Sequence, residues 1–454
     1  MKEVETRIDD YIKDKLDDYI VQLTKLCAQP SVSAKGVGIE GCAALVADML
    51  RERDFVVQIL PTAGNPVVVG RLEGNSERTL LCYNHYDVQP EEPLELWTTP
   101  PFEPTVRDGA LYARGATDDK GEFMARLAAV DAVRSANGGQ LPCGITFVVE
   151  GEEEVGSPYI APFVQEHKEL LKSQGALWET GGVDPSDRPA MVLGVRGVLG
   201  CELSVQTINR DAHSGNAHYL PNAAWRLLRA LESLKGTDEW IRIKGFYDQA
   251  RAPSELDNSL IEALPDHEAW VREYYGTNKI VRDLQGNGLD RAVFDPTCNI
   301  QGLTAGHQGL GMKTIIPSKA SAKLDFRLVP DQDPDDIYEK LLAHLGENGF
   351  SDVEVTPYGR MWPAKSPADD PLVQLAVQAA EEVYGQTPLI DPLGGGSSPV
   401  YAFAKPLGDI PVITAGVSYP GNQAHAPNEH VRLKDFVKGA QHIARIMNGF
   451  ADLP

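Results

Sequence analysis

An apolar run that ends in four carboxylates constrains this chain more than any other segment. Residues Ile145 to Val149 are followed by Glu150 and then by Glu152, Glu153 and Glu154. A short apolar run bounded by turn residues is typical of a buried strand. Carboxylates crowded at the end of such a strand repel one another and resist desolvation unless a cation lies among them. The segment therefore predicts a buried strand whose end requires a positively charged partner.

Size and composition indicate a globular protein with more than one domain. The chain has 454 residues, of which 42% are hydrophobic and 24% charged, and this length exceeds what one core usually holds. The net charge of −23 disfavours nucleic acid and anionic membrane as partners. The sequence shows no membrane-spanning apolar run and no N-terminal signal pattern. The six cysteines are scattered without a C-x-x-C pair, so we expect buried thiols in the reducing cytoplasm.

Apolar runs alternate with helical patterns in two stretches of the chain, residues 1–195 and 361–454. This alternation predicts an α/β domain with a mixed, mostly parallel sheet flanked by helices. Between the two stretches, residues 196–360 follow the order β-α-β-β-α-β, which is that of a ferredoxin-like α+β unit. A polar region at about 236–297 is interpreted as an insertion in that unit. We therefore expect a second domain inserted in the first.

Several other predicted segments end on histidine or carboxylate side chains. His85 and Glu179 follow strands, His425 lies in a late loop, and Asp118 precedes a helix. Because ligands of α/β sheets bind beyond the carboxyl ends of the strands, we expect these side chains to meet the acids that follow Val149. Taken alone, each has an ordinary alternative, such as a satisfied core histidine or an N-cap aspartate. Together they predict a metal site, with Zn²⁺ favoured and Mn²⁺ or Co²⁺ as alternatives.

Six motifs resemble those of a known family, and they occur in the family's order. The family is that of the dizinc amidohydrolases, which include carnosinases, cytosolic non-specific dipeptidases, glutamate carboxypeptidases, aminoacylases and succinyl-diaminopimelate desuccinylase. The motifs are His85-Tyr-Asp87-Val-Gln-Pro, Arg114-Gly-Ala-Thr-Asp118-Asp119-Lys-Gly, Glu150-Gly-Glu152-Glu153-Glu154-Val-Gly-Ser, Asp211-Ala-His213-Ser-Gly, Phe326-Arg327-Leu-Val-Pro and Ala424-His425-Ala-Pro-Asn428-Glu429. The first and third lean toward the dipeptidase and carnosinase branch. The resemblance implies a zinc-exopeptidase-like catalytic domain with an inserted lid and dimerisation domain.

The resemblance also implies a ligand set for two divalent metal ions per subunit. Asp118 is expected to bridge the two ions. The first ion is expected to bind His85 and Glu179 as well, and these three residues are called the first half-site below. The second ion is expected to bind Glu154 and His425 together with Asp118, and these are called the second half-site.

Two further residues receive catalytic roles from the resemblance. Glu153 is expected to be the general base that takes a proton from water and delivers it to the leaving amine. Asp87 is expected to orient His85 through the second ring nitrogen. Composition does not separate the acids at 152–154, so their order comes from alignment to the following Gly-Ser. Asp119 is assigned only a supporting role.

The inserted domain carries the remaining predicted site residues. The resemblance implies that His213 reaches the active site of a partner subunit and stabilises the oxyanion there. It also implies that Arg327 binds the terminal carboxylate of the substrate, for which a forked guanidinium is suited. Ser397, Gly395 and Gly396 are expected to line the substrate pocket. The ordinary alternatives are a capping histidine at 213 and a strand surface charge at 327.

The function predicted in this way is a metal-dependent dipeptidase or carboxypeptidase that acts on short peptides with a free C-terminal carboxylate. One alternative is an N-acyl amino acid deacylase of the acetylornithine, succinyl-diaminopimelate or aminoacylase kind, and another is a non-catalytic metal-binding scaffold. Two positions depart from the family pattern. Glu179 stands where the dipeptidase branch usually has Asp, and Asn84 stands where a small residue is common.

Overall fold

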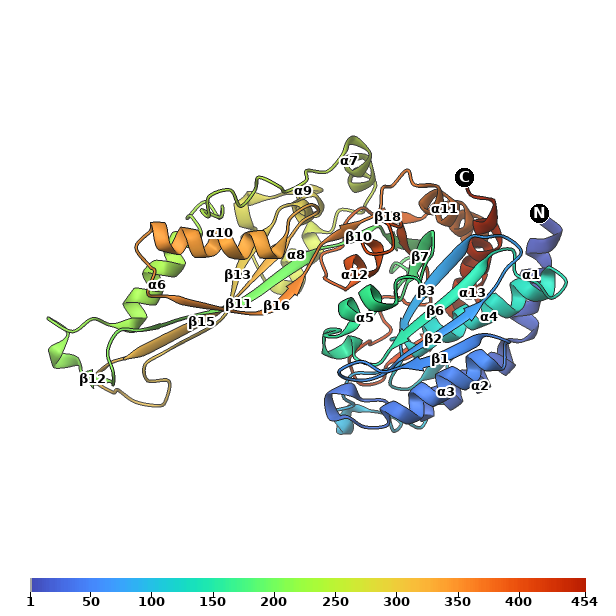
Figure 1. The fold of residues 1–454 in the computed structure, drawn as a ribbon, viewed down its shortest axis with the longest axis horizontal. Helices are drawn as coiled ribbons and strands as arrows, with labels where there is room; N and C mark the ends of the chain where they lie inside the picture. Colours follow the sequence, from blue (N-terminus) through green and yellow to red (C-terminus); the bar gives the residue numbers. More distant parts are fainter. Residues whose placement is uncertain (1) are drawn as a thin grey trace. The chain divides into compact units, whose positions relative to one another are not determined.

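The computed structural model describes residues 2–454, which form two compact units (Figure 1). Unit 1 holds the described residues up to Leu193, together with Lys365–Pro392 and Ala402–Pro454. Unit 2 holds Gly194–Ala364 and Leu393–Tyr401. Within the described residues, none of the helices has the length and apolar character that a bilayer crossing requires.

Unit 1 is built from seven helices and twelve strands. The helices are α1 (Lys2–Asp14), α2 (Leu16–Ala28), α3 (Ile39–Arg51), α4 (Lys120–Ala136), α5 (Ile160–His167), α11 (Pro371–Tyr384) and α13 (Leu433–Gly449). The strands are β1 (Val56–Leu60), β2 (Val67–Leu72), β3 (Thr79–His85), β4 (Thr105–Arg107), β5 (Ala110–Tyr112), β6 (Gly144–Glu150), β7 (Gly175–Trp178), β8 (Gly182–Val183), β9 (Pro189–Val192), β18 (Leu389–Asp391), β19 (Val412–Thr414) and β20 (His430–Arg432).

The main sheet of unit 1 has the order β1-β2-β6-β3-β7-β19. The four strands from β6 to β19 are parallel, whereas β1 and β2 add an antiparallel hairpin at one edge. Helix α3 packs on the hairpin, α4 on β3 and α11 on β19, and α13 packs on α4 (Figure 1). This arrangement confirms the predicted α/β class with a mixed sheet flanked by helices.

The parallel strands are buried along their whole length, which explains their continuous apolar runs. Every residue of β6 and all but the first of β3 are buried. Both strands therefore carry their polar last residues, Glu150 and His85, to the same buried edge of the sheet. Helix α4 begins at that edge with the buried Lys120, whose Nζ donates to the carbonyls of Leu26 and Gln29 at the end of α2 at 3.1 and 2.7 Å.

Unit 2 is organised around a four-stranded antiparallel sheet of order β13-β15-β11-β16. Its strands are β11 (Gly197–Gln206), β13 (Thr297–Ala305), β15 (Lys319–Leu328) and β16 (Glu354–Met361), and short pairs form at β10 (Gly194–Val195), β12 (Ala212–His213), β14 (Ile315–Ile316) and β17 (Ala364–Lys365). Helices α6 (Ala223–Leu234) and α10 (Pro334–Glu347) pack on the sheet through one apolar core. The chain order is β-α-β-β-α-β, as the sequence predicts.

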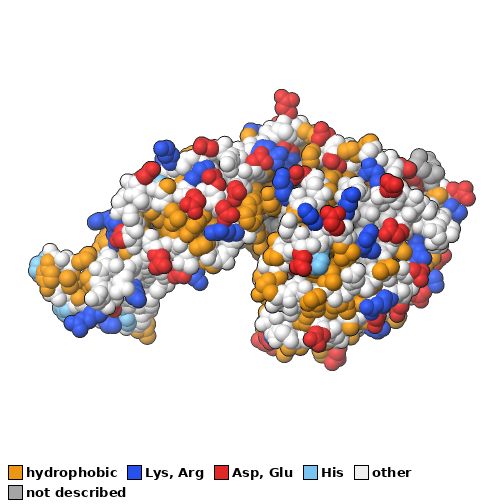
Figure 2. All heavy atoms as spheres, viewed as in Figure 1, with side chains coloured by type: hydrophobic (Ala, Val, Ile, Leu, Met, Phe, Trp, Pro, Cys, Tyr) orange, Lys and Arg blue, Asp and Glu red, His pale blue; other side chains and the backbone are white. Residues whose placement is uncertain are grey.

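Three short helices of unit 2 lie in the chain between α6 and β13. They are α7 (Glu255–Glu262), α8 (Glu268–Tyr275) and α9 (Gly288–Arg291), and α12 (Val400–Ala404) contains the chain position at which unit 2 ends. On the molecular face drawn in Figure 2, basic and acidic side chains are interspersed in both units. A surface of this kind offers no continuous positive field to a nucleic acid on that face.

Candidate metal centre

The carboxylate of Asp118 lies between two imidazole rings in unit 1. Its Oδ1 is 3.0 Å from Nε2 of His85, which is the last residue of β3. Its Oδ2 is 2.8 Å from Nε2 of His425, which lies in the loop before β20. One oxygen therefore faces each histidine, which is the arrangement that a carboxylate needs to bridge two cations.

Glu154 completes a compact group of ligand atoms with these residues. Ligand atoms of His85, Asp118 and Glu154 all lie within 4.8 Å of one another. Oε2 of Glu154 is 3.2 Å from Nε2 of His425, and the side chain accepts hydrogen bonds from Gln89. The structure thus brings four of the five predicted ligands into contact with one another. Imidazole nitrogens and carboxylate oxygens are the donor set of a Zn²⁺ site.

The electrostatics of the group show how strongly the acids act on the histidines. Hydrogen bonds that the ring donates to the carboxylates of Asp118 and Glu154 raise the pKa of His425 to about 10. Burial disfavours the charged ring of His85, yet its hydrogen bonds to Asp118 and Asp87 outweigh this and raise its pKa well above the usual value. Burial also opposes ionisation of Asp118, but hydrogen bonds from both histidines lower its pKa below the usual range. The site favours positive charge at the ring nitrogens.

Glu179, the fifth predicted ligand, follows β7 directly and is 6% exposed. Its Oε1 accepts a hydrogen bond from the indole of Trp178 at 3.1 Å, whereas its buried Oε2 has no hydrogen-bond partner within residues 2–454. Burial, and then the charge of Glu153, raises the pKa of Glu179 well above its ordinary value. A buried acid with one unsatisfied oxygen beside other acids fits a cation ligand, so the residues present suit a divalent metal ion.

Asp87 supports both the histidine and the base. The ring Nδ1 of His85 lies 3.0 Å from the backbone oxygen of Asp87 and 3.4 Å from its Oδ1, so Asp87 fixes the orientation of the ring. The two carboxylate oxygens of Asp87 accept the backbone N–H groups of Glu153 and Glu154 at 3.2 and 3.1 Å. Asp87 therefore also fixes the turn that carries these two acids, a role that the sequence did not reveal.

The other two acids after β6 have structural contacts of their own. Glu150 is buried and accepts hydrogen bonds from Ser157 Oγ at 2.5 Å and from the hydroxyl of Tyr83. Burial raises the pKa of Glu150 to about 7. Glu152 accepts the backbone N–H of Asn65 at 3.0 Å. The four acids thus divide into two that brace the loop and two that face the centre.

Asp118 and Asp119 are joined by a cis peptide bond, and their side chains make different contacts. Asp119 is buried, and its Oδ2 accepts the backbone N–H of His85 at 3.0 Å and the amide of Asn84 at 2.6 Å. Burial raises the pKa of Asp119 to about 7. Asp119 therefore holds the end of β3 next to His85. The departure at Asn84 has a structural reason, because its amide links Asp119 to the end of the strand.

Glu429 is the site residue to which sequence reasoning assigned no role. Its buried carboxylate accepts hydrogen bonds from the backbone N–H groups of Gly115, Thr117 and Asp118 at 2.9, 3.0 and 3.0 Å. It also accepts one from Nη1 of Arg114 at 2.8 Å. One carboxylate thereby fixes the loop that presents Asp118. Its place in the Asn428-Glu429 motif was the only signal for it in the sequence.

The remaining predicted residues lie in unit 2. Nη1 of Arg327 donates to Oγ of Ser397 at 2.7 Å, and the carbonyl of Gly396 accepts the N–H of Arg196 at 2.8 Å. The structure thus brings Arg327 to the loop that also contains Gly395. His213 is exposed, and its Nδ1 accepts the N–H of Gly215 at 3.0 Å.

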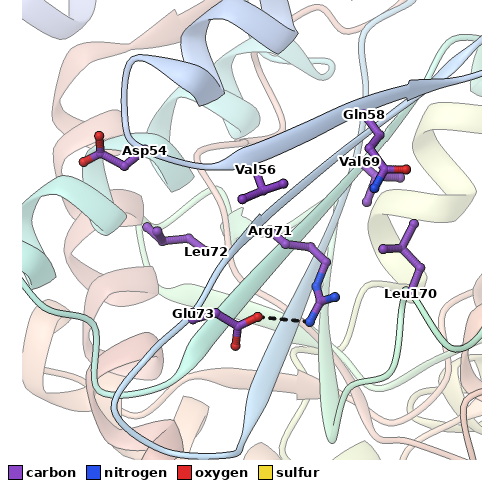
Figure 3. A pocket seen from close by; sticks show the side chains of 8 residues that line it. All are labelled: Asp54, Val56, Gln58, Val69, Arg71, Leu72, Glu73 and Leu170. Carbon is purple, nitrogen blue, oxygen red and sulfur yellow. Dashed lines mark hydrogen bonds and ion pairs between the residues drawn. The ribbon is translucent and has the colours of Figure 1, made fainter.

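Unit 1 also has a pocket of about 320 Å³ beside β1 and β2, and none of the predicted site residues line it (Figure 3). Its lining residues are Asp54, Val56, Gln58, Val69, Arg71, Leu72, Glu73 and Leu170. The only ion pair drawn there joins Arg71 to Glu73 at 3.2 Å, between exposed side chains (Figure 3). Among the described residues, the group of possible metal ligands around Asp118 lies outside this pocket.

Comparison with known proteins gives consistent matches over most of the chain. A sequence profile of the peptidase family M20/M25/M40 matches residues 81–449. A beta-Ala-His dipeptidase of Rattus norvegicus is 27% identical over 405 residues, covering 85% of this chain and 80% of the relative. A Cys-Gly metallodipeptidase of Schizosaccharomyces pombe is 26% identical over 461 residues, covering 94% of each. The crystal structure of an M20 family metallo-carboxypeptidase from Sulfolobus solfataricus matches with a TM-score of 0.88 and 33% identity, covering 96% of this chain and 99% of that one.

Proposed function

The chain belongs to the peptidase family M20/M25/M40, and on that premise we propose that it hydrolyses dipeptides and short peptides that carry a free C-terminal carboxylate. The membership confirms the family predicted from the six motifs and identifies the protein as a hydrolase. The named relatives include two dipeptidases and a carboxypeptidase, which supports peptides over N-acyl amino acids as substrates.

The observation that carries this proposal is the Asp118 carboxylate between His85 and His425, with Glu154 beside them. We assign Asp118, His85 and Glu179 to one divalent ion, and Asp118, Glu154 and His425 to a second, with Zn²⁺ favoured over Mn²⁺ or Co²⁺. Such a pair of ions, when bound, acidifies a shared water and polarises the scissile carbonyl.

Glu153 is the proposed general base. Its backbone is fixed by Asp87, so its carboxylate is placed next to the ligand Glu154. Burial raises the pKa of Glu153 above its usual range, and the charges of Glu154 and Asp118 contribute in the same direction. A raised pKa suits a group that must take a proton from the attacking water and hold it. The same carboxyl then delivers the proton to the nitrogen of the leaving amine.

Substrate selection is assigned to unit 2. A guanidinium binds a carboxylate with two parallel hydrogen bonds, and Arg327 presents one beside Ser397. We propose that Arg327, Ser397, Gly395 and Gly396 bind the C-terminal carboxylate end of the peptide. His213 is proposed to stabilise the oxyanion in the active site of a partner subunit.

We further propose that the protein is a cytoplasmic homodimer joined through unit 2. Large apolar side chains are exposed there, including Tyr219 (63%), Trp225 (62%) and Met312 (91%), and hydrophobic atoms gather at the end of the unit that carries β12 and α6 (Figure 2). Exposed apolar surface of this kind is typical of an interface. All six cysteines are buried and unpaired, as expected in a reducing compartment.

A substrate panel tests the proposed activity. Purified protein is loaded with zinc, manganese or cobalt and assayed on free dipeptides, on the same dipeptides amidated at the C-terminus, and on N-acetyl and N-succinyl amino acids. We expect free dipeptides to be turned over fastest and amidation to reduce kcat/KM strongly. Faster hydrolysis of the acylated amino acids would identify a deacylase instead. A metal-replete protein that hydrolyses none of them would be a binding scaffold.

A further inference from the structure

Arg126 is a fully buried arginine that the proposed reaction does not use. It lies on α4 with an exposed fraction of 0%. Burying a guanidinium is unfavourable unless its donors and its charge are compensated. Its surroundings therefore show what the charge does in this fold.

The hydrogen bonds of Arg126 join the ends of two neighbouring strands. Nη1 donates to the carbonyl of Tyr83 in β3, and Nη2 donates to the carbonyl of Trp178 in β7. Tyr83 precedes His85 by two residues, and Trp178 directly precedes Glu179. One guanidinium thus binds the backbone next to two of the three ligands of the first half-site.

These bonds begin where the strand pairing stops. The parallel ladder between β3 and β7 runs from Leu80 and Gly175 to Cys82 and Leu177 and ends there. The carbonyls of the next two residues, Tyr83 and Trp178, both accept hydrogen bonds from Arg126. The hydrogen bonds of the guanidinium therefore connect β3 and β7 at the point where the backbone pairing of the two strands stops.

A second chain of contacts leads from Arg126 to the bridging segment. Nη1 donates to Oδ1 of Asn84 at 2.8 Å, and the amide of Asn84 donates to Oδ2 of Asp119 at 2.6 Å. The guanidinium charge also favours the ionised forms of Asp119 and Glu122, against the effect of burial on their pKa. Glu122 lies one turn before Arg126 on α4. Arg126 is thus a counter-ion of the buried acids as well as a link between strands.

We propose that Arg126 is a positioning residue for the first half-site, setting the separation of His85 and Glu179 by holding the ends of β3 and β7. The proposal rests on the ligand set of the proposed function, but it concerns metal binding rather than substrate. Residues that orient metal ligands typically change metal affinity by about 10- to 100-fold when removed. No contact links Arg126 to Glu154 or His425 among the interactions described for residues 2–454, so the second half-site should be affected less.

The test measures zinc binding to metal-free full-length protein by competition with a chromophoric chelator. For Arg126→Met we expect one of two Zn²⁺ ions to bind about 10- to 100-fold more weakly, and the other to change by less than about threefold. Arg126→Lys keeps the charge but cannot donate to both strands in a fixed fork, so it should restore only part of the affinity. Circular dichroism and thermal unfolding establish that each variant is folded.

Arg53→Met is the matched control. Arg53 is also buried in unit 1, at 7% exposure, and is bound to Asp131 at 3.0 Å, but it contacts none of the predicted ligands. Its loss should lower stability and leave both zinc affinities unchanged. A folded Arg126→Met variant with two wild-type affinities would overturn the proposal, as would an equal loss in Arg53→Met.

If Arg126→Met does not fold, the two Zn²⁺ affinities are measured in Arg126→Gln and Arg126→Lys instead. Wild-type Zn²⁺ affinities in both of these variants would overturn the proposal. Wild-type protein that binds two Zn²⁺ ions but hydrolyses no dipeptide refutes the proposed function alone. Wild-type protein that binds no Zn²⁺ refutes both.

Discussion

The two half-sites of the candidate centre are held by the chain in different ways. His85 and Glu179 end neighbouring parallel strands, and their side chains are 1% and 6% exposed. His425 lies in a loop, is 53% exposed and has a left-handed φ of 61°. A non-glycine residue in that region is strained by about 1 kcal/mol or more, so the surrounding loop must hold it there. The first half-site is thus built on the sheet, whereas the second combines Glu154, whose side chain is 3% exposed, with a histidine on an exposed loop.

This difference has a consequence for function. A ligand on buried strands is fixed with the core, while a ligand on an exposed loop can move without unfolding it. We therefore expect the first ion to be the more tightly held and the second to exchange more readily. Because the proposed ligand set assigns Asp118 to both half-sites, we expect a variant at Asp118 to affect the two half-sites equally.

The largest expected effect is on turnover. Glu153→Gln should reduce kcat by roughly 10²- to 10⁴-fold, because the proposed general base is lost, while both metal ions should remain bound. Initial rates on a free dipeptide and the metal content of the purified variant measure this. Glu152→Gln is the matched control, since Glu152 bonds the backbone of Asn65, and it should keep most of the activity. A Glu153→Gln variant with near-wild-type kcat would remove Glu153 from the mechanism.

The next effect is on both half-sites together. Glu429→Gln should weaken the binding of both ions by roughly 10-fold or more, because an amide cannot accept at both ends from the four N–H donors that hold the Asp118 loop. Zinc titration of the metal-free variant measures it. This outcome contrasts with Arg126→Met, which should affect one ion. Loss of a single ion in Glu429→Gln would show that its loop serves only one half-site.

A smaller effect is the difference between His85 and His425 in how much each side chain contributes to the free energy of unfolding. Measured by urea unfolding with excess chelator, His85→Ala should lower the free energy of unfolding by about 1–3 kcal/mol, because the half-buried Asp118 and the buried Asp87 each lose a hydrogen bond to the ring. His425→Ala should change it by about 0.5 kcal/mol or less, since that side chain is exposed. Equal losses in the two variants would contradict the contrast between strand and loop.

A further effect, confined to acidic pH, concerns a buried histidine whose ring bonds a backbone carbonyl. His442 on α13 bonds the carbonyl of Ala376 at 2.9 Å, and burial lowers its pKa to about 4. As the pH falls, the histidine is therefore protonated in the unfolded chain before it is protonated in the folded protein. The contribution of the neutral ring to the free energy of unfolding is complete above about pH 6.5 and is lost as the pH falls toward about 4. The total loss is roughly 3 kcal/mol. Comparing wild type with His442→Gln in urea unfolding at several pH values isolates it, and identical pH profiles would refute it.

The sequence was sufficient to predict the strand ends. The acids at the end of β6 and the histidine at the end of β3 were recognised because a buried apolar run that stops on a charged residue has few explanations. The order of elements in unit 2 was likewise visible in the pattern of strands and helices. Apolar side chains recur at helical spacing between Ile8 and Leu23 and predict one helix there, but the structure divides the segment into α1 and α2 at Lys15.

The contacts that support the ligands could not be predicted in this way. Glu150, Arg126 and Glu429 are polar residues whose partners are chosen by packing between distant segments. A sequence pattern shows which side chains gather at one edge of a sheet, but not which carbonyl a buried guanidinium will meet. The order of the motifs predicted the roles of the ligands, whereas the hydrogen bonds in the structure indicate the roles of the residues that hold those ligands in place.

The contacts of Glu429 also determine when the centre can form. The donors that bind its carboxylate lie 311 to 315 residues earlier in the chain. On a ribosome, the Asp118 loop therefore emerges long before the residue that fixes it, and His425 emerges almost as late. Chains fold from the N-terminal side as they are made, at about 5–20 residues per second. If the metal ions bind as proposed, we therefore expect them to be acquired only after the last segment of the chain has been made, and a truncated chain that lacks this segment should not complete the site.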